Sequence, residues 1–102
     1  MIKRSGKFFV YMIECNNGTL YTGYTVDLEN RLKLHKTGKG AKFLRGKTPL
    51  KLVYVKEYAY LRNALKEERR IKTLTKPWKE KLISKGIKIP EFYHDILEEV
   101  NL

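Results

Sequence analysis

The apolar residues near the start of the chain fall into two short stretches separated by a polar turn. These stretches, residues 8–14 and 20–25, are rich in aromatic and β-branched side chains, and Asn16-Asn17-Gly18 lies between them. This order predicts a β-hairpin. A further apolar run, residues 50–58, predicts a third strand.

The loop length of the hairpin decides which of its side chains share a face. A two-residue turn would place Tyr11 and Tyr21 on opposite sides of the sheet. A three-residue loop that ends on Gly18 in the left-handed conformation would pair Tyr11 with Gly23 and bring both tyrosines to one face. We favour the three-residue loop, because glycine suits its last position and because Gly23 would leave open space above the sheet opposite Tyr11.

Helical spacing begins after the hairpin. Asp27 is expected to cap a helix that runs to about Thr37 and ends at Gly38. One stripe of this helix holds Leu28, Arg31, Leu32 and His35. Arg31 and His35 are suited to binding a phosphate together, since a guanidinium grips phosphate oxygens and an imidazole donates or accepts a proton. The alternative is that both lie at the edge of the apolar face with their polar ends in solvent.

A second predicted helix, residues 61–74, carries a charge where its pattern calls for a hydrophobe. Its apolar stripe is interrupted at Glu68, and an ionised carboxylate there is costly unless it is paired or binds a metal. One interpretation is a partly buried ion pair with Lys72 or an arginine. The other is an oxygen ligand for Mg²⁺, which takes few carboxylates and keeps several waters.

Two shorter helices are expected towards the C-terminus. One begins after Thr75 with Pro77 in its first turn, where proline is tolerated. The other follows Pro90 and is expected to dock on the core through apolar residues at helical spacing, namely Phe92, Ile96 and Val100. We assign Trp78, Phe43 and Phe92 to core or loop packing.

The length and charge of the chain indicate how many domains it has and what kind of partner it binds. A chain of 102 residues fits one domain, in which we expect residues 1–89 to form the body and residues 90–102 an acidic helix packed on it. All 22 basic residues lie at or before Lys88, where the net charge is +15, and the last fourteen residues carry −4. The overall charge of +11 favours a polyanionic partner, either nucleic acid or an anionic membrane surface.

The segment 36–51 is the main candidate for contacts with phosphate groups. It holds six basic residues, three glycines and no acid, which predicts a mobile, positively charged loop. Its basic side chains are expected to contact a nucleic-acid backbone: Lys36, Lys39, Lys42, Arg45 and Lys47. A solvated loop without this role is the commoner meaning of such a charge run.

Secreted and membrane-spanning classes are disfavoured. The single cysteine, Cys15, forms no internal disulfide. The apolar run near the N-terminus is about six residues long, too short for a signal peptide or for the roughly 18 residues of a membrane span. We therefore expect a cytosolic monomer that does not bind membranes. The acidic helix leaves a protein partner open as a second interaction.

Several short motifs, taken in order, resemble the GIY-YIG nuclease superfamily and especially its small stand-alone bacterial members of unassigned function. The resemblance covers roughly residues 8–85. It rests on Val10-Tyr11, Tyr21-Thr22-Gly23, Arg31, His35, the basic loop, and Ala64-Leu65-Lys66-Glu67-Glu68. It implies an α/β (α+β) fold with a three-stranded antiparallel sheet flanked by helices. It also implies phosphodiester hydrolysis that depends on Mg²⁺ or Mn²⁺.

The resemblance implies a role for each candidate site residue. Tyr11 matches the tyrosine thought to activate the attacking water, and Tyr21 matches the one that helps hold water or phosphate. Arg31 matches the arginine that stabilises charge on the phosphate, and His35 matches a histidine of some branches. Glu68 matches the single metal-binding carboxylate. Phosphodiester cleavage needs these three functions: a base, a charge stabiliser and a Lewis acid.

Departures from the family pattern keep other functions open. Phe9 stands where the first motif usually has glycine, and Thr22 replaces the isoleucine of the second. Residues 76–81 offer no match for the asparagine of many catalytic members. We predict an endonuclease acting on DNA, with branched, nicked or single-stranded forms and RNA left open. The alternatives are a nucleic-acid-binding module of the same fold without useful catalysis, and an adaptor that docks another protein through its acidic tail.

Overall fold

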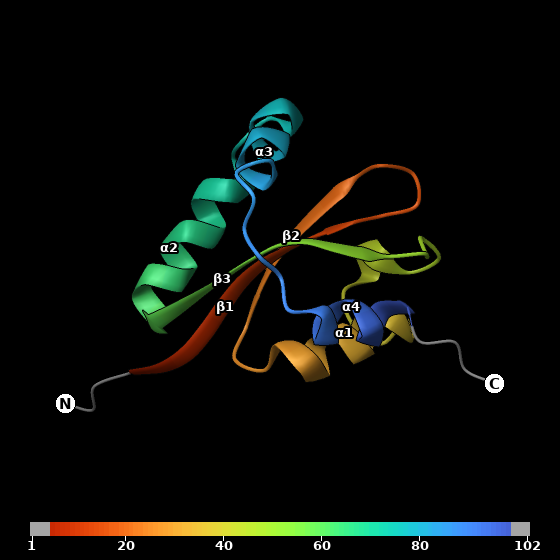
Figure 1. Ribbon diagram of the computed structural model, residues 1–102, viewed down its shortest axis with the longest axis horizontal. Helices are drawn as coiled ribbons and strands as arrows, with labels where there is room; N and C mark the ends of the chain where they lie inside the picture. The colour runs from red at the N-terminus through yellow and green to blue at the C-terminus, as the bar shows by residue number, and fades with distance from the viewer. Residues whose placement is uncertain (1–4, 99–102) are drawn as a thin grey trace.

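The computed structural model describes residues 5–98 and shows an α/β fold built around one antiparallel sheet (Figure 1). The strands are β1 (Ser5–Glu14), β2 (Leu20–Thr25) and β3 (Lys51–Tyr60). Their order in the sheet is β2-β1-β3, so the N-terminal strand is central and β2 forms an edge. The predicted hairpin and third strand are confirmed, although β3 runs further than predicted because the next helix follows it without a loop.

The β1–β2 loop has the length that brings the two motif tyrosines to one face. Tyr11 pairs with Gly23 and Ile13 with Tyr21, and Gly18 adopts the left-handed conformation with φ 84°. The three-residue loop is therefore confirmed. The expected open space above Gly23 is not found, because the Tyr11 phenol fills it. A Cβ added to Gly23 would lie only 2.6 Å from the Tyr11 hydroxyl.

The helices follow the predicted order along the chain. They are α1 (Leu28–Lys36), α2 (Leu61–Lys72), α3 (Lys76–Ile83) and α4 (Glu91–Glu98). Asp27 caps α1 as predicted, since its carboxylate accepts the backbone N–H of Asn30 at 3.1 Å. Among residues 5–98, no helix has the length and apolar character that crossing a membrane requires.

The sheet has a hydrophobic core on each face. Odd-numbered residues of β1 join α1, α4 and the segment 44–52 in one cluster, whereas even-numbered residues join α2 in the other. This division follows from strand geometry, because successive side chains point to opposite faces. Figure 1 shows the same layers, with α1 and α4 on one side of the sheet and α2 and α3 on the other.

The basic segment 36–51 has more local structure than a mobile loop. It contains a 3₁₀ turn, η1 (Lys42–Leu44). Leu44 and Leu50 are buried in the core and attach the segment to the sheet. Phe43 is 45% exposed, so of its predicted core or loop packing only the loop packing is found, against Tyr21 and Lys47. The neighbouring Leu44 takes the buried position of the turn.

The C-terminal helix α4 docks on α1 and β3 as predicted, through a face that includes the predicted Ile96 but not the predicted Phe92. Ile96 and Leu97 are buried, with Tyr93 half-buried beside them, whereas Phe92 is 51% exposed. Residues 93, 96 and 97 form one helical stripe, which leaves Phe92 on its flank. Val100, also predicted in the docking face, lies outside the described residues.

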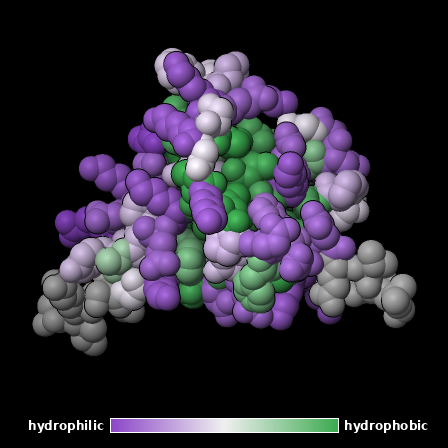
Figure 2. All heavy atoms as spheres, viewed as in Figure 1, coloured by the Kyte–Doolittle hydropathy of each residue, from purple (hydrophilic) through white to green (hydrophobic). Residues whose placement is uncertain are grey.

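Helix α3 exposes the only tryptophan of the chain. Its Leu82 and Ile83 pack against the core on the α2 side of the sheet, and Trp78 is 58% exposed. The packing assignment of Trp78 is therefore wrong, because the apolar residues at the C-terminal end of α3 fill that role. Figure 2 shows hydrophilic side chains over most of this view, around a central hydrophobic patch.

Candidate active site

The centre of the candidate site is a buried hydrogen bond between β1 and α1. The Tyr11 hydroxyl lies 2.6 Å from His35 Nε2, and both side chains are buried. The other ring nitrogen, Nδ1, accepts the backbone N–H of Ala41 at 3.3 Å. A nitrogen that accepts a hydrogen bond carries no proton, so the neutral imidazole holds its proton on Nε2 and donates it to the Tyr11 oxygen.

Both members of this pair are held in their neutral forms. Burial, followed by the charge of Arg31, lowers the pKa of His35 to about 4. Burial raises the pKa of Tyr11 well above its ordinary value; Tyr21 adds to the rise and Arg31 opposes it. At neutral pH the pair is therefore an imidazole and a phenol. Because the Tyr11 oxygen accepts from His35, the phenol proton is directed to a different acceptor.

Tyr21 links this pair to the basic segment through ring contacts. Its ring centroid lies 6.3 Å from that of Tyr11 and 5.6 Å from that of His35. On the other side it stacks on Phe43, at 6.0 Å and an interplanar angle of 24°. Lys47 Nζ lies 3.4 Å from the centroid of Phe43. Phe43 is thus a neighbour of the site that the sequence analysis missed.

Arg31 contributes a cation that lacks a protein partner at one of its nitrogens. Its charge acts on the pKa of both Tyr11 and His35, so the guanidinium lies near the buried pair. Within the described part of the chain its Nε is buried and makes no hydrogen bond; the hydroxyl of Thr22 is in the same condition. Buried donors normally have partners, and an unpaired guanidinium N–H is the kind of group that an incoming anion satisfies.

Glu68 approaches from the opposite side of the sheet. Its helix, α2, covers the face away from α1 (Figure 1). Its side chain is 17% exposed, and Oε2 lies 3.4 Å from Nζ of Lys72. The charge of Glu68 raises the pKa of Tyr11, but it is the smallest of the causes. The ion pair with Lys72 that the sequence suggested is confirmed, and a metal-ligand role for Glu68 stays a prediction.

The donor chemistry around Glu68 fits a hard divalent ion held by one protein group. Among residues 5–98, the structure holds no cluster of three or more His, Cys, Asp or Glu side chains suited to a metal. An ion at Glu68 would therefore complete its shell with water and substrate oxygens. Mg²⁺ commonly binds in this way.

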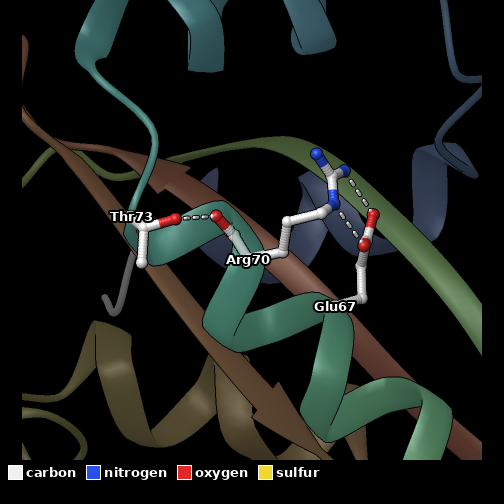
Figure 3. A network of polar contacts seen from close by, with 3 residues as sticks. All are labelled: Glu67, Arg70 and Thr73. Atoms are coloured by element: carbon white, nitrogen blue, oxygen red, sulfur yellow. Dashed lines mark hydrogen bonds and ion pairs between the residues drawn. The ribbon is translucent and has the colours of Figure 1, made fainter.

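The adjacent Glu67 has its oxygens occupied by a partner (Figure 3). They accept from Nε and Nη2 of Arg70 at 2.7 Å each, and Thr73 Oγ1 donates to the Arg70 carbonyl at 2.7 Å. The hydrogen bonds from Arg70 lower the pKa of Glu67. Burial, and then the Glu67 charge, raise the pKa values of Tyr54 and Tyr58. Tyrosine, arginine and glutamate thus come together on the α2 face of the sheet.

Comparisons with known proteins place the chain in a family. Residues 7–81 match the model of the GIY-YIG catalytic domain. The chain belongs to the GIY-YIG family. It is 49% identical to the UPF0213 protein OB0043 of Oceanobacillus iheyensis, over 74% of this chain and 87% of that protein.

Two solved structures share the fold of this chain. The solution structure of the UPF0213 protein BH0048 from Bacillus halodurans matches with a TM-score of 0.55 and 40% identity, over 79% of this chain and 86% of that one. The solution structure of EF2693 from E. faecalis matches with a TM-score of 0.58 and 26% identity, over 87% and 98%. Both the predicted family and the predicted fold class are confirmed.

Gly40 is a second feature of this GIY-YIG domain that the sequence analysis missed. A Cβ added there would lie 2.9 Å from Cε1 of the His35 ring and 3.0 Å from the His35 backbone nitrogen. The absence of a side chain lets the chain turn back over the ring, where Ala41 donates to Nδ1. The signal available in the sequence was a second glycine so soon after Gly38, which ends α1.

The predicted nucleic-acid-binding residues of the GIY-YIG domain do not all lie together. Lys39, Lys42 and Arg45 are exposed, and Lys47 covers Phe43. Lys36 differs, because its Nζ is buried and has no hydrogen-bond partner among the described residues. It lines a cavity of about 370 Å³ beside residues 48–50 and Leu97 of α4.

Proposed function

We propose that the protein is a metal-dependent endonuclease that hydrolyses phosphodiester bonds in DNA. The observation that carries this proposal is the buried Tyr11–His35 pair beside Arg31, whose Nε is left without a partner. A purely structural cluster would satisfy that donor, because leaving it unpaired is costly. A phosphate group that enters from solvent would satisfy it.

The hydrogen bond between His35 and Tyr11 suits Tyr11 to act as a base once its phenol has lost its proton. The His35 Nε2–H points at the Tyr11 oxygen and stabilises a phenolate there. Arg31 favours the phenolate, while burial opposes it. In the phenolate form, the Tyr11 oxygen would accept a proton from the attacking water, and His35 would hold that oxygen in place.

The edge position of β2 gives a phosphodiester access to both sides of the sheet. A strand of DNA lying along this edge would meet Arg31 on the α1 side and Glu68 on the α2 side. Arg31 would bind the nonbridging oxygens and Glu68 would hold the divalent ion. Bound Mg²⁺ supplies a Lewis acid that stabilises charge on the phosphate oxygens.

DNA is the proposed substrate because the net charge of +11 favours a polyanion. Exposed basic side chains lie in the segment that reaches the Tyr21 ring through Phe43, namely Lys39, Lys42 and Arg45. Neutralising these three and Lys47 would remove up to four phosphate contacts, so the slope of log K against log salt on duplex DNA should flatten by roughly 3 to 4 units. An unchanged slope would show that these four side chains do not contact the DNA phosphates and that the binding surface lies elsewhere.

The test of the enzymatic proposal is a cleavage assay over several DNA and RNA structures with Mg²⁺ or Mn²⁺. Glu68→Gln keeps the shape of the side chain and removes its charge. For a metal ligand, the substitution should abolish cleavage and metal binding while stability stays the same or rises. Glu67→Gln is the matched control, since it changes the neighbouring carboxylate, which is already occupied by Arg70. That control should keep its cleavage activity.

A second candidate function is a nucleic-acid-binding module of the same fold without turnover. Two observations favour it: the Glu68 carboxylate is paired with Lys72, and burial disfavours the Tyr11 phenolate. Lys72→Ala separates the two functions, because freeing the carboxylate should raise metal affinity in a nuclease. A protein that binds DNA, shows no saturable metal effect on thermal unfolding and cleaves nothing would establish the binding module.

A further inference from the structure

Helix α3 presents an aromatic ring and cations to solvent, outside the site described above. The Trp78 ring is 58% exposed, and Lys81 Nζ lies 4.9 Å from its centroid. Residues 76–88 hold five lysines and a single acid, Glu80. Isolated exposed apolar residues are common on proteins, but a tryptophan among so many cations is a combination that recognises nucleic acid.

The start of α3 adjoins the hairpin that carries the catalytic tyrosines. Lys76 Nζ lies 3.5 Å from the position of a Cβ on Gly18, in the β1–β2 loop. From Tyr11 to Glu14, the last residue of β1 before this loop, is about 10 Å at the rise of a β-strand, or about three base steps of DNA. Figure 1 shows α3 and the hairpin loop on the same side of the molecule, with the linker to α4 leading away from α3.

We infer that α3 and the turn after it form a second nucleic-acid contact, in which an unpaired base stacks on Trp78 while Lys81 of α3 and Lys85 of the turn bind the flanking phosphates. The inference rests on the proposed function only in taking nucleic acid as the ligand. A strand that follows the β2 edge from Tyr11 towards the hairpin loop arrives at Lys76 and then at Trp78. The contact therefore lies a few nucleotides from the cleaved bond.

The charge of α3 and of the turn after it favours this ligand over an apolar protein surface. Lys76, Lys81 and Lys85 are exposed, and burying them unpaired against a hydrophobic partner would be costly. Phosphate groups spaced along a strand offer each cation a partner. The indole adds an affinity that does not depend on base sequence, because every base has a π-face.

The sole tryptophan makes the inference directly measurable, since all indole emission comes from Trp78. The probe is a single-stranded oligonucleotide titrated into the wild-type protein in EDTA, so that binding is measured without cleavage. We expect saturable quenching of the emission. Trp78→Ala should weaken binding about 5- to 150-fold, the range for loss of one base–aromatic stack. The Lys81→Ala/Lys85→Ala double variant should reduce the salt slope by about 1.4 units on a single strand.

A matched control uses the other half-exposed aromatic helix residue, Phe92 of α4, which is 51% exposed and lies beside acidic residues. Phe92→Ala should bind as tightly as the wild type. Unchanged emission together with wild-type affinity of Trp78→Ala would overturn the inference. A response to phosphatidylserine vesicles but not to the oligonucleotide would also overturn it. Quenching by the oligonucleotide in a wild-type protein that cleaves no substrate would instead count against the proposed nuclease function and leave the α3 contact standing.

Discussion

Each face of the sheet carries a polar cluster that contains tyrosine and arginine, and only the cluster on the α1 face has an arginine nitrogen without a partner among the described residues. On the α2 face, Glu67 and Arg70 bond through two short contacts near Tyr54 and Tyr58. On the α1 face, the Tyr11–His35 hydrogen bond lies near Arg31, whose Nε has no partner in the described chain. The first cluster is satisfied by the protein itself. The second leaves a donor for a ligand, and this difference separates a structural cluster from a functional one.

The strongest test of this comparison replaces the arginine of each cluster. Arg31→Ala should lower the cleavage rate by about 10²- to 10³-fold, the cost of removing one charge-stabilising donor. Its free energy of unfolding should fall by about 1 kcal/mol, because the hydrogen bond of Arg31 to Tyr11 is lost. Arg70→Ala should cleave at the wild-type rate under the same conditions. Equal losses of activity in both variants would remove the functional distinction between the faces.

Acid should lower the free energy of unfolding through His35, which lies on the α1 face of the sheet. His35 has a folded pKa of about 4 against an ordinary value of 6.5, so the unfolded chain binds more protons between these values. The free energy of unfolding is therefore fully retained above pH 6.5 and falls by about 3 kcal/mol as the pH drops to 4. Denaturant unfolding across this range should show the loss in the wild type. The His35→Gln variant should lack this part of the pH dependence, while its carboxylates titrate as before.

The packing of Gly40 against His35 gives a smaller test of the same face. Gly40→Ala must displace the ring or the chain above it, at a cost of about 1 to 3 kcal/mol, and should also weaken cleavage through His35. Gly6→Ala is the control, because a Cβ there meets only ordinary contacts of 3.8 Å. Thermal unfolding and cleavage rates of both variants check this prediction. A stable, fully active Gly40→Ala would show that the turn does not position the ring.

The smallest effect is expected from the satisfied cluster. Arg70 is 51% exposed at its side chain, so water screens its ion pair with Glu67, and Arg70→Ala should cost no more than about 1 kcal/mol of stability. Urea unfolding of Arg70→Ala measures the loss of the ion pair with Glu67. The same measurement on Thr73→Val gives the separate contribution of the hydrogen bond from Thr73 Oγ1 to the Arg70 carbonyl. A loss of several kcal/mol would mean that the α2 face depends on this pair more than its exposure indicates.

Local chemistry made the hairpin and α1 predictable from sequence. Gly18 specifies the loop length, the loop length sets the β1–β2 register, and Asp27 marks the start of α1. The pairing of Glu68 with Lys72 was predictable for the same reason, because residues four apart meet on a helix.

Features that depend on tertiary approach were not predictable from sequence. Whether Phe43 or Leu44 is buried depends on how the 3₁₀ turn meets the sheet, and both residues are apolar. The need for glycine at position 40 appears only when the chain crosses the His35 ring. The docking face of α4 was also not predictable, because this short helix has two overlapping apolar stripes. One contains Phe92 and Ile96, and the other, which packs on the core, contains Tyr93, Ile96 and Leu97.

The central position of β1 ties the integrity of the fold to the integrity of the site. Because β1 supplies alternate side chains to both cores, a residue inserted into or deleted from the loop 16–18 would turn β2 over and move Tyr21 to the α2 face. A length change in the exposed stretch around Gly46, where an added Cβ would meet open space, carries no such penalty. Insertions and deletions among relatives should therefore be rejected at the first loop and tolerated at the second.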